Sequence, residues 1–354
     1  MSGPRVRFEW PPPRCMVVAE LSANHGGSLE VALEAVRAAA RAGADAIKIQ
    51  TYRPDTLTID APQEHFVVRG GPWDGRTLYD LYQEAHTPWE WHAPIFEAAH
   101  EAGIPAFSTP FDASAVDFLE SLEVPAYKIA SFELVDLELL RRVASTKKPI
   151  VMSTGMATLE EIARSVAAIR EVWGGADPGL ALLRCVSAYP ASPRDMHLRT
   201  IARLEELFGA IPGLSDHTLG SAVATTAVAF GARIIEKHFT LDRRAGGPDS
   251  SFSMEPEEFA QLVRDVRVAC EAIGEVRFGP SEGDRGSLTF RRSIFVVEDV
   301  EPGETFTREN VRVIRPGHGL PPHLLPNVLG RRARARCARG TPLVGELIEG
   351  WEEG

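Results

Sequence analysis

Short apolar runs alternate with amphipathic segments along most of the chain. The runs cover residues 15–25, 46–52, 104–110, 126–133, 149–156, 180–190, 211–218 and 233–240. Their length and composition are typical of buried strands, and the segments between them repeat apolar residues at helical spacing. Eight strands alternating with helices predict a parallel sheet, and the count of eight favours a closed (β/α)8 TIM barrel. An open doubly wound sheet is the competing fold, but no G-x-G-x-x-G follows the first run.

Boundary residues predict where several helices begin and end. Residues 87–90 read as a capping box with Pro88 at the first helical position, and Gly103 ends that helix. A second capping box spans residues 158–161. A third helix is expected to start at Pro256 and to end at Gly274.

The composition divides the chain into two domains. Residues 277–289 are polar and glycine-rich, as expected of a linker. The chain from 290 to 354 has short β-like runs and many turn residues, which predict a small β-rich domain. The barrel is assigned to residues 15–276, after a tail over 1–14 that is expected to be flexible. The long connection over 53–86 is open to two interpretations, a lid over a site or a surface insertion packed by its own aromatics.

Charge and cysteine content narrow the functional classes. The net charge of −11 argues against a general nucleic-acid or membrane-surface binder, and the arginine cluster at 330–336 is too short to reverse this. No apolar stretch reaches the length of a membrane span, and the N-terminus lacks the apolar core of a signal peptide. Four scattered cysteines read as free thiols in a reducing cytoplasm, and Cys185 is interpreted as a small buried hydrophobe.

Ionisable and hydroxyl side chains occur at the ends of all eight predicted strands. In a parallel barrel these ends meet at one mouth, where active sites form. The sequence therefore predicts an active site built from Glu20, Asn24, His25, Lys48, Gln50, Ser108, Thr109, Lys128, Ser131, Glu133, Ser153, Thr154, Ser187, Tyr189, Ser215, Asp216, His217, Glu236 and His238.

The residue types at this mouth suit a particular chemistry. His217 and His238 lie on neighbouring strands, so both imidazoles can meet one divalent metal that polarises a carbonyl oxygen. Lys48 and Lys128, with several hydroxyls, suit a phosphate. Together with carboxylates that could act as bases or hold sugar hydroxyls, these groups indicate carbon–carbon bond formation with a phosphorylated partner.

Two alternatives remain open at this point. A Schiff-base aldolase would use Lys48 or Lys128 as its nucleophile, although the two histidines argue against it. A carbohydrate-binding protein with a decayed site would keep the fold without turnover. In the segment 236–238, Glu236 shares the face of His238, whereas Lys237 points the other way and is expected to be structural.

Several motifs resemble those of one known family. AELSANHGGSLE, DAIKIQTY, FSTPFD, YKIASFE, STGMAT, GLSDHTLG, EKHFT and GGPDSSFSMEP resemble the sialic acid synthase (NeuB-like) family in order and spacing. FRRSIFVVEDVEPGE and IRPGHGL are similar to its antifreeze-like, or SAF, domain. The resemblance covers nearly the whole chain.

The resemblance implies a metal-dependent condensation of phosphoenolpyruvate with an N-acetylated amino-sugar aldehyde. It implies that His217 and His238 hold Mn²⁺, with Mg²⁺ or Co²⁺ as alternatives, and that Glu20 manages protons and the attacking water. The implied phosphoenolpyruvate ligands are Lys48, Gln50, Thr109, Lys128, Ser131, Ser153, Ser187 and Ser215. The implied sugar ligands are Glu133, Tyr189, Asp249 and Phe252, together with Arg315 from the SAF-like domain of the partner in a domain-swapped homodimer.

Local segments also bear on the sugar. AELSANH, the stretch over 73–92, RCVSAYP and GPDSSFS resemble the branch that uses 2,4-diacetamido-2,4,6-trideoxy-L-altrose. An N-acetylneuraminate or legionaminate synthase, the alternative, more typically has histidine and lysine after GPD and asparagine in place of Ser187. Ser250, Ser251 and Phe252 stand after Asp249 here, and Phe252 suits the methyl groups of a less polar sugar.

Overall fold

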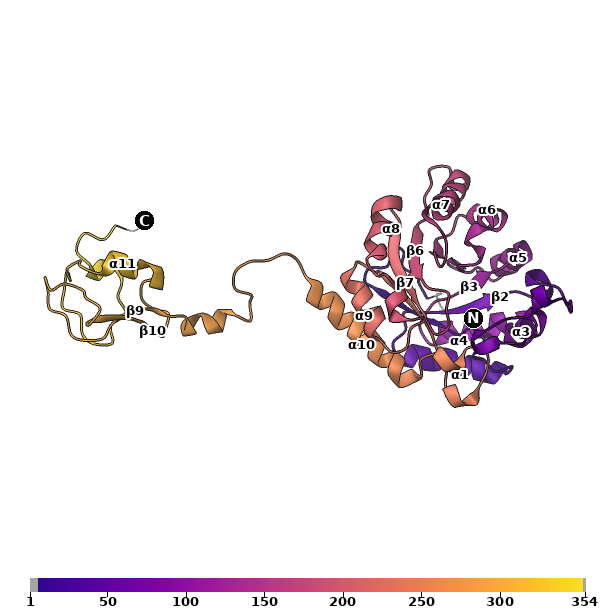
Figure 1. Cartoon of the computed structure of the whole chain (residues 1–354), viewed down its shortest axis with the longest axis horizontal. Coiled ribbons are helices and arrows are strands. Elements are labelled where there is room, and N and C mark those ends of the chain that lie inside the picture. Colours follow the sequence, from indigo (N-terminus) through magenta and orange to yellow (C-terminus); the bar gives the residue numbers. More distant parts are fainter. Residues whose placement is uncertain (1–5, 353–354) are drawn as a thin grey trace. The chain divides into compact units, whose positions relative to one another are not determined.

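The computed structural model describes residues 6–352, and it divides into two compact units, residues 1–274 and 275–354. In the first unit, eight parallel strands close into a barrel surrounded by helices (Figure 1). All eight predicted strands are present, so the predicted TIM barrel is confirmed. They are β1 (Met16–Glu20), β2 (Ala46–Thr51), β3 (Ala106–Pro110), β4 (Tyr127–Ile129), β5 (Ile150–Ser153), β6 (Leu180–Cys185), β7 (Ile211–Asp216) and β8 (Ile234–His238).

The helices follow the strands in sequence and cover the outside of the barrel. They are α1 (Leu29–Arg41), α2 (Pro54–Leu57), α3 (Leu78–Ala85), α4 (Trp89–Glu101), α5 (Ala113–Ser121), α6 (Leu137–Ser145), α7 (Leu159–Trp173), α8 (Thr200–Phe208), α9 (Ala222–Ala229) and α10 (Pro256–Ile273). Within residues 6–352, no helix has both the length and the apolar character needed to cross a bilayer.

The predicted helix boundaries are confirmed in two cases and wrong in one. Thr158 and Glu161 form the predicted capping box of α7, and α10 runs from Pro256 to its C-cap at Gly274. At α4, however, Pro88 is itself the N-cap, and no side chain caps the helix. The Thr87 hydroxyl is buried without a hydrogen-bond partner, because proline after Thr87 holds the backbone extended and places the threonine one residue too early to cap.

Strand alternation explains which residues reach the barrel interior. Along β1, Val17 and Ala19 pack outward against the helices, whereas Met16 and Val18 face the interior with Phe107, Val151, Leu183 and Ile234. Glu20 continues the inward-facing series at the carboxyl end of the strand. The interior is thus apolar toward the base and ionisable at the mouth.

The N-terminal segment packs against the base of the barrel. Phe8 and Trp10 stack at 5.7 Å between ring centroids and join the interior apolar cluster, with Phe8 5.9 Å from Phe107. Gly179, at φ +116°, lies so close to Trp10 that a Cβ there would collide with the indole. Residues of the expected flexible tail therefore contribute to the core from Phe8 onward, while residues 1–5 lie outside the described residues.

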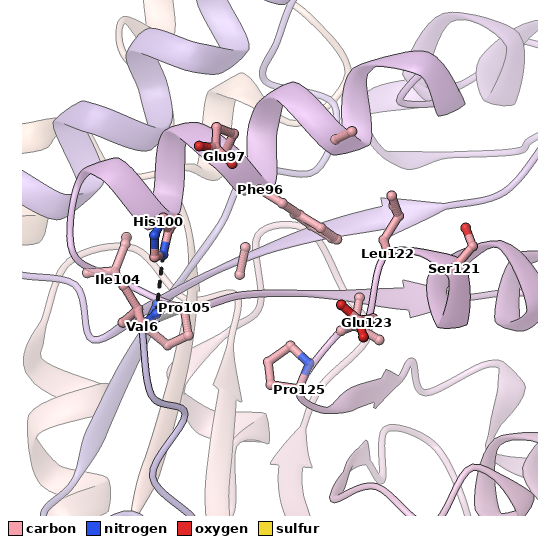
Figure 2. Close-up of a pocket in the computed structure, with 13 residues that line it drawn as sticks. Val6, Phe96, Glu97, His100, Ile104, Pro105, Ser121, Leu122, Glu123 and Pro125 are labelled. Carbon is pink, nitrogen blue, oxygen red and sulfur yellow. Dashed lines mark hydrogen bonds between the residues drawn. The ribbon is translucent and has the colours of Figure 1, made fainter. Parts of the chain in front are cut away.

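A cavity of about 370 Å³ lies at the same end of the barrel (Figure 2). It is bounded by the C-terminal parts of α4 and α5 and by the residues that lead into β3 and β4. The Val6 amide donates to His100 Nδ1 at 3.2 Å along its edge. Because the amino ends of the strands face this cavity, it is separate from the mouth where the predicted site residues lie.

The second unit is a small β-rich domain. Strands β9 (Ser293–Val296) and β10 (Val311–Ile314) pair antiparallel. Isolated bridges, among them Val300 with Cys337 and Ala333 with Ile348, connect the remaining loops around an apolar core that includes Ile294, Val296 and Phe306. The sequence pattern did not predict the short helix α11 (Leu325–Val328).

Candidate active site

Most of the predicted strand-end residues lie together at the mouth of the barrel, whereas Ser108 and Asp216 point outward, Ser108 to Thr51 and Asp216 to Lys237. Most are buried, because each follows an inward-facing apolar residue on its strand or comes from the loop just beyond it. The buried members are Glu20, Lys48, Thr109, Lys128, Ser131, Ser153, Ser215, His217, His238, Asp249 and Phe252, and the half-buried ones are Gln50, Glu133, Ser187 and Tyr189.

A buried ion pair forms one side of the mouth. Lys48 Nζ lies 2.8 Å from Glu20 Oε2 and 3.6 Å from Glu236 Oε1, and it donates to Thr109 Oγ1 at 3.1 Å. Burial raises the pKa of Glu20, although the charge of Lys48 opposes this. Burial would lower the pKa of Lys48, but the carboxylates of Glu20 and Glu236 outweigh it and raise that pKa. Lys48 is therefore a fixed cation beside a carboxyl group that can accept a proton.

Lys128 is a second buried cation with a different environment. Its Nζ donates to Ser153 Oγ at 2.7 Å and to the Ile129 carbonyl at 2.9 Å. Among residues 6–352, no carboxylate lies within ion-pair distance of it, and burial lowers its pKa. A desolvated ammonium with only neutral partners is a strong binding point for an anion, because it regains a counter-charge when the anion arrives.

Glycine at position 155 allows two serines to approach its backbone. Gly155 adopts φ +45°, and a Cβ at this position would come within 2.3 Å of the Ser131 Cβ and 3.0 Å of Ser187 Oγ. The buried Ser187 hydroxyl has no hydrogen-bond partner among the described residues. A larger residue at position 155 would therefore displace Ser131, and the Ser187 hydroxyl is available to a ligand.

The two predicted metal ligands face each other. The rings of His217 and His238 have centroids 5.3 Å apart. Because the Val186 carbonyl 2.8 Å away can only accept, His217 Nδ1 carries the proton and Nε2 keeps its lone pair. Burial lowers the pKa of His238 well below its ordinary value, and the charge of His217 adds to this. Its buried Nδ1 has no hydrogen-bond partner among the described residues, so both histidines can offer a lone pair.

A hydrogen-bond chain runs from Asp249, which lies beside this histidine pair, to the buried ion pair. Asp249 Oδ2 lies 3.9 Å from His238 Nδ1 and accepts from Ser22 Oγ at 2.5 Å. Gln50 Nε2 donates to Ser22 Oγ at 2.9 Å and to Glu20 Oε1 at 2.8 Å. The orientation of each polar group in the chain therefore depends on its neighbours.

Aromatic rings cover the histidines on the outer side. The Tyr189 ring lies 4.3 Å from His217 and 6.2 Å from His238 between centroids. Phe252 packs 5.1 Å from His238 and 5.2 Å from Tyr189. Glu133 is largely buried at the same mouth, and burial raises its pKa to about 7.

The other predicted residues have separate positions. Lys237 points away from the mouth, where its Nζ lies 2.6 Å from Asp216 Oδ2, as expected for a structural residue. Glu236 accepts from Ser215 at 3.3 Å and supports the site. Arg315 is exposed in the second unit.

Sequence reasoning missed three contributors. Ser22 was not singled out, although it adopts φ +47° to reach Asp249. Gly155 has no side chain, so nothing in the sequence marked it as part of the site. Cys185, interpreted as a small buried hydrophobe, is indeed buried but its Sγ lies 3.9 Å from His217 Nδ1 and accepts from Ser131 Oγ at 3.4 Å. Burial alone would raise the pKa of Cys185, but His217, followed by Ser131 and Lys128, lowers it to about 7.

No cluster of three or more His, Cys, Asp or Glu side chains with metal-ligand geometry occurs in residues 6–352. The histidine pair alone fits a divalent ion, because each ring in its neutral form offers a lone pair and His238 Nδ1 is buried without a hydrogen-bond partner in the described chain. Water and a substrate oxygen would complete such a shell.

Fold and mouth together define a (β/α)8-barrel enzyme that binds an anionic substrate beside two facing imidazoles. Residues 35–278 match the model of the NeuB family, and residues 291–349 match that of the SAF domain. The chain belongs to the NeuB family and carries a SAF domain.

Named relatives support this membership. The pseudaminic acid synthase of Campylobacter jejuni is 46% identical over 320 residues, which cover 90% of this chain and 92% of that protein. The pseudaminic acid synthase of Helicobacter pylori is 42% identical over 340 residues, covering 96% and 98%. The crystal structure of N-acetylneuraminic acid synthetase from Leptospira borgpetersenii, in complex with citrate, has a TM-score of 0.69 at 30% identity and covers 78% of this chain and 90% of that one.

Proposed function

We propose that this chain is a transferase that catalyses the pseudaminic acid synthase reaction. It condenses phosphoenolpyruvate with 2,4-diacetamido-2,4,6-trideoxy-L-altrose and releases phosphate. Membership of the NeuB family and two relatives named pseudaminic acid synthase support the assignment. The observation that carries it on the side of the site is Lys128, a buried cation that lacks an ion-pair partner in the described chain and donates only to the Ser153 hydroxyl and the Ile129 carbonyl.

The anionic donor is assigned to the lysine side of the mouth. Lys48 and Lys128 supply charge for the phosphate and carboxylate of phosphoenolpyruvate. Hydroxyl and amide groups around them complete the binding, with Gln50, Thr109, Ser131, Ser153, Ser187 and Ser215 as the proposed ligands. Charge-assisted hydrogen bonds of this kind are stronger than neutral ones and hold the donor with its methylene carbon toward the histidines.

The acceptor is assigned to the histidine side. Glu133, Tyr189, Asp249 and Phe252 are proposed to hold the sugar. His217 and His238 would hold a divalent ion, Mn²⁺ with Mg²⁺ or Co²⁺ as alternatives, and the ion would polarise the aldehyde oxygen of the acceptor.

The reaction balances without any other reagent. The methylene carbon of phosphoenolpyruvate forms a bond with the aldehyde carbon, and the aldehyde oxygen takes a proton to become a hydroxyl. Water adds to the resulting cationic C2, and the C2–O bond to phosphate breaks, which leaves a 2-keto acid. Glu20, whose pKa burial raises, is the proposed group for the proton that this water loses.

A panel of acceptors tests the function directly. The protein would be incubated with phosphoenolpyruvate, Mn²⁺ and either the diacetamido trideoxy sugar or N-acetylmannosamine, and products would be identified by mass. We expect turnover of the diacetamido sugar and weak cross-reaction with N-acetylmannosamine, because methyl contacts alone discriminate modestly. Turnover of N-acetylmannosamine alone would instead assign the N-acetylneuraminate synthase reaction. The reaction is proposed to occur in the cytoplasm, where the four free cysteines stay reduced.

The environment of Lys128 favours one other mechanism. Burial lowers its pKa, as in lysines that form Schiff bases. A Schiff-base aldolase would be trapped covalently by borohydride in the presence of substrate. We expect no such adduct, because phosphoenolpyruvate presents an enol phosphate ester at this position and not a ketone.

The activity is expected to depend on the ionisation of Glu133. Burial raises its pKa to about 7, so the carboxylate that can accept sugar hydroxyls forms only as the pH rises through 7. Below this pH, kcat/KM for the sugar should fall about tenfold per pH unit. In Glu133→Gln this slope should disappear, since the amide does not titrate. An unchanged pH profile in Glu133→Gln would show that Glu133 does not take part in sugar binding.

We further propose a domain-swapped homodimer in which Arg315 of one subunit serves the sugar site of the other. The support is the SAF-domain match and an exposed arginine beside a tight turn. Arg315→Ala should raise the KM for the sugar far more than that for phosphoenolpyruvate.

Mixing two impaired variants, at a sugar concentration where neither turns over well, tests the swap. After subunit exchange between Arg315→Ala and His238→Ala, half of the dimers are mixed, and one of the two sites in each contains both intact residues. About a quarter of the wild-type sites should therefore return. If exchange is demonstrated and no activity returns, Arg315 acts within its own subunit or has no role.

A further inference from the structure

The long connection between β2 and α4 contains a small flap, residues 67–77. Val67 and Thr77 form an antiparallel bridge at its base, and the Val68 amide donates to the Arg76 carbonyl at 2.8 Å. Gly70, Gly71 and Gly75 all have positive φ, which lets the chain reverse direction within a few residues. The flap is therefore a closed unit of its own, with Trp73 at its tip.

Trp73 contacts two different loops of the barrel mouth. Its ring lies 5.5 Å from that of Tyr189, in the loop after β6. Its indole Nε1 donates to the Pro248 carbonyl at 2.8 Å, in the loop after β8 and directly before Asp249. One side chain thus connects the flap to the loops that carry Tyr189 and Asp249.

Tyr189 and Asp249, the two neighbours of Trp73 in these loops, in turn lie beside the two histidines. Tyr189 packs on His217, and Asp249 lies 3.9 Å from His238 Nδ1 and accepts from Ser22. A shift of Pro248 would move Asp249, and loss of the indole would free the outer face of Tyr189. Lys48 and Lys128 themselves make none of these contacts, and Gln50 is reached only through Ser22, so the effect is expected to be largest on the acceptor side of the mouth.

We propose that Trp73 is a positioning residue that determines acceptor selectivity by holding Tyr189 and the Asp249 loop to the flap. The inference rests on the proposed function, because it concerns the sugar side of that site. Selectivity for one acceptor requires that the side chains lining its site stay in place. If the Tyr189 ring can move outward, the site admits acceptors of other shapes and holds the correct acceptor less well.

Trp73→Ala tests the inference because it should change the KM for the sugar much more than the KM for phosphoenolpyruvate. We expect the KM for the diacetamido sugar to rise about tenfold, because packing and a hydrogen bond to the loop are both lost. The KM for phosphoenolpyruvate should stay within about twofold. The ratio of kcat/KM for the diacetamido sugar over N-acetylmannosamine should fall about fivefold or more. Trp73→Phe keeps an aromatic ring against Tyr189 but removes the hydrogen bond, so it should lie between wild type and Trp73→Ala.

Trp89→Phe is a matched control. Trp89 also donates from its indole to a backbone carbonyl, that of Tyr52 at 3.3 Å, but it stacks on Phe118 and lacks a contact with Tyr189 or Pro248. It should leave the acceptor ratio unchanged, which separates positioning from general loss of stability. If Trp73→Ala fails to fold, the acceptor ratio of Trp73→Phe can be compared with that of Trp89→Phe in the same way.

The result that overturns the inference is specific. Equal changes in both KM values, or an unchanged acceptor ratio in a folded Trp73 variant, would mean that Trp73 is only structural. The measurement uses whichever sugar of the panel the wild type turns over. If the diacetamido sugar is not the substrate, the Trp73 variants can therefore still be tested with the sugar that the wild type uses, and the two proposals can fail independently.

Discussion

His238→Ala is expected to lower kcat by about 10²- to 10³-fold and to abolish tight Mn²⁺ binding. His238 is buried, neutral and directed toward His217, so its removal deletes one of two proposed ligands of the ion. His217→Ala should lower kcat and weaken Mn²⁺ binding to a similar extent. The measurements are steady-state phosphate release and calorimetric titration of the metal-free protein with Mn²⁺. Exhaustive chelation should likewise stop wild-type turnover, and added Mn²⁺ should restore it.

His92→Ala is the control for this prediction. His92 is a buried histidine that hydrogen-bonds to Thr51 Oγ1 at 2.8 Å and packs against Phe118, without a contact to the histidine pair. Its replacement should lower the free energy of unfolding but leave Mn²⁺ affinity unchanged. Full activity after complete removal of divalent ions would refute the metal assignment.

Lys128→Met is expected to reduce kcat/KM for phosphoenolpyruvate by about 10³-fold, since a charge-assisted contact to an anion is lost from a buried site. The methionine approximates the length of the lysine stem, so packing is largely kept. The KM for the sugar should change little. Initial rates measured with each substrate varied in turn distinguish the two parameters.

Lys237→Met provides a matched comparison, because Lys237 is also a buried strand-end lysine. It points away from the mouth and is paired with Asp216 at 2.6 Å. Its loss leaves the buried Asp216 carboxylate without a counter-charge, which costs about 3–5 kcal/mol in the free energy of unfolding. The folded fraction should keep near-normal kinetics for phosphoenolpyruvate. Similar kinetic losses in both variants would contradict the assignment of Lys128 to the donor.

The barrel could be predicted from sequence because its signals are local and repeated. Each strand is a short apolar run, and each inward-facing series ends in an ionisable or hydroxyl residue, so Glu20, Lys48 and His238 could be placed at one mouth from the sequence. The failed capping box at Thr87 shows the limit of a local pattern. The proline that marked the helix start also displaced the cap by one residue.

The rest of the site depends on contacts between segments that are distant in sequence. Ser22 matters only because Asp249 lies beside it, and Gly155 only because Ser131 and Ser187 approach its backbone. Small residues of this kind carry little signal in a single sequence. The aromatic content of the 53–86 connection was noticed, but the position of Trp73 over Tyr189 required the folded chain.

Closure of the barrel brings together residues from its first and last strands. In the register of β1 and β8, Glu20 lies directly opposite His238, and Asp249 and Phe252 follow later still. Glu20, the carboxyl group that we propose for proton transfer, and His238 therefore become neighbours only when the eighth strand docks on the first. During synthesis, a nascent chain that has not yet released β8 from the ribosome holds lysines and carboxylates but no complete centre. Turnover thus begins only with a finished barrel, and partial translation products or half-barrel fragments should be inactive.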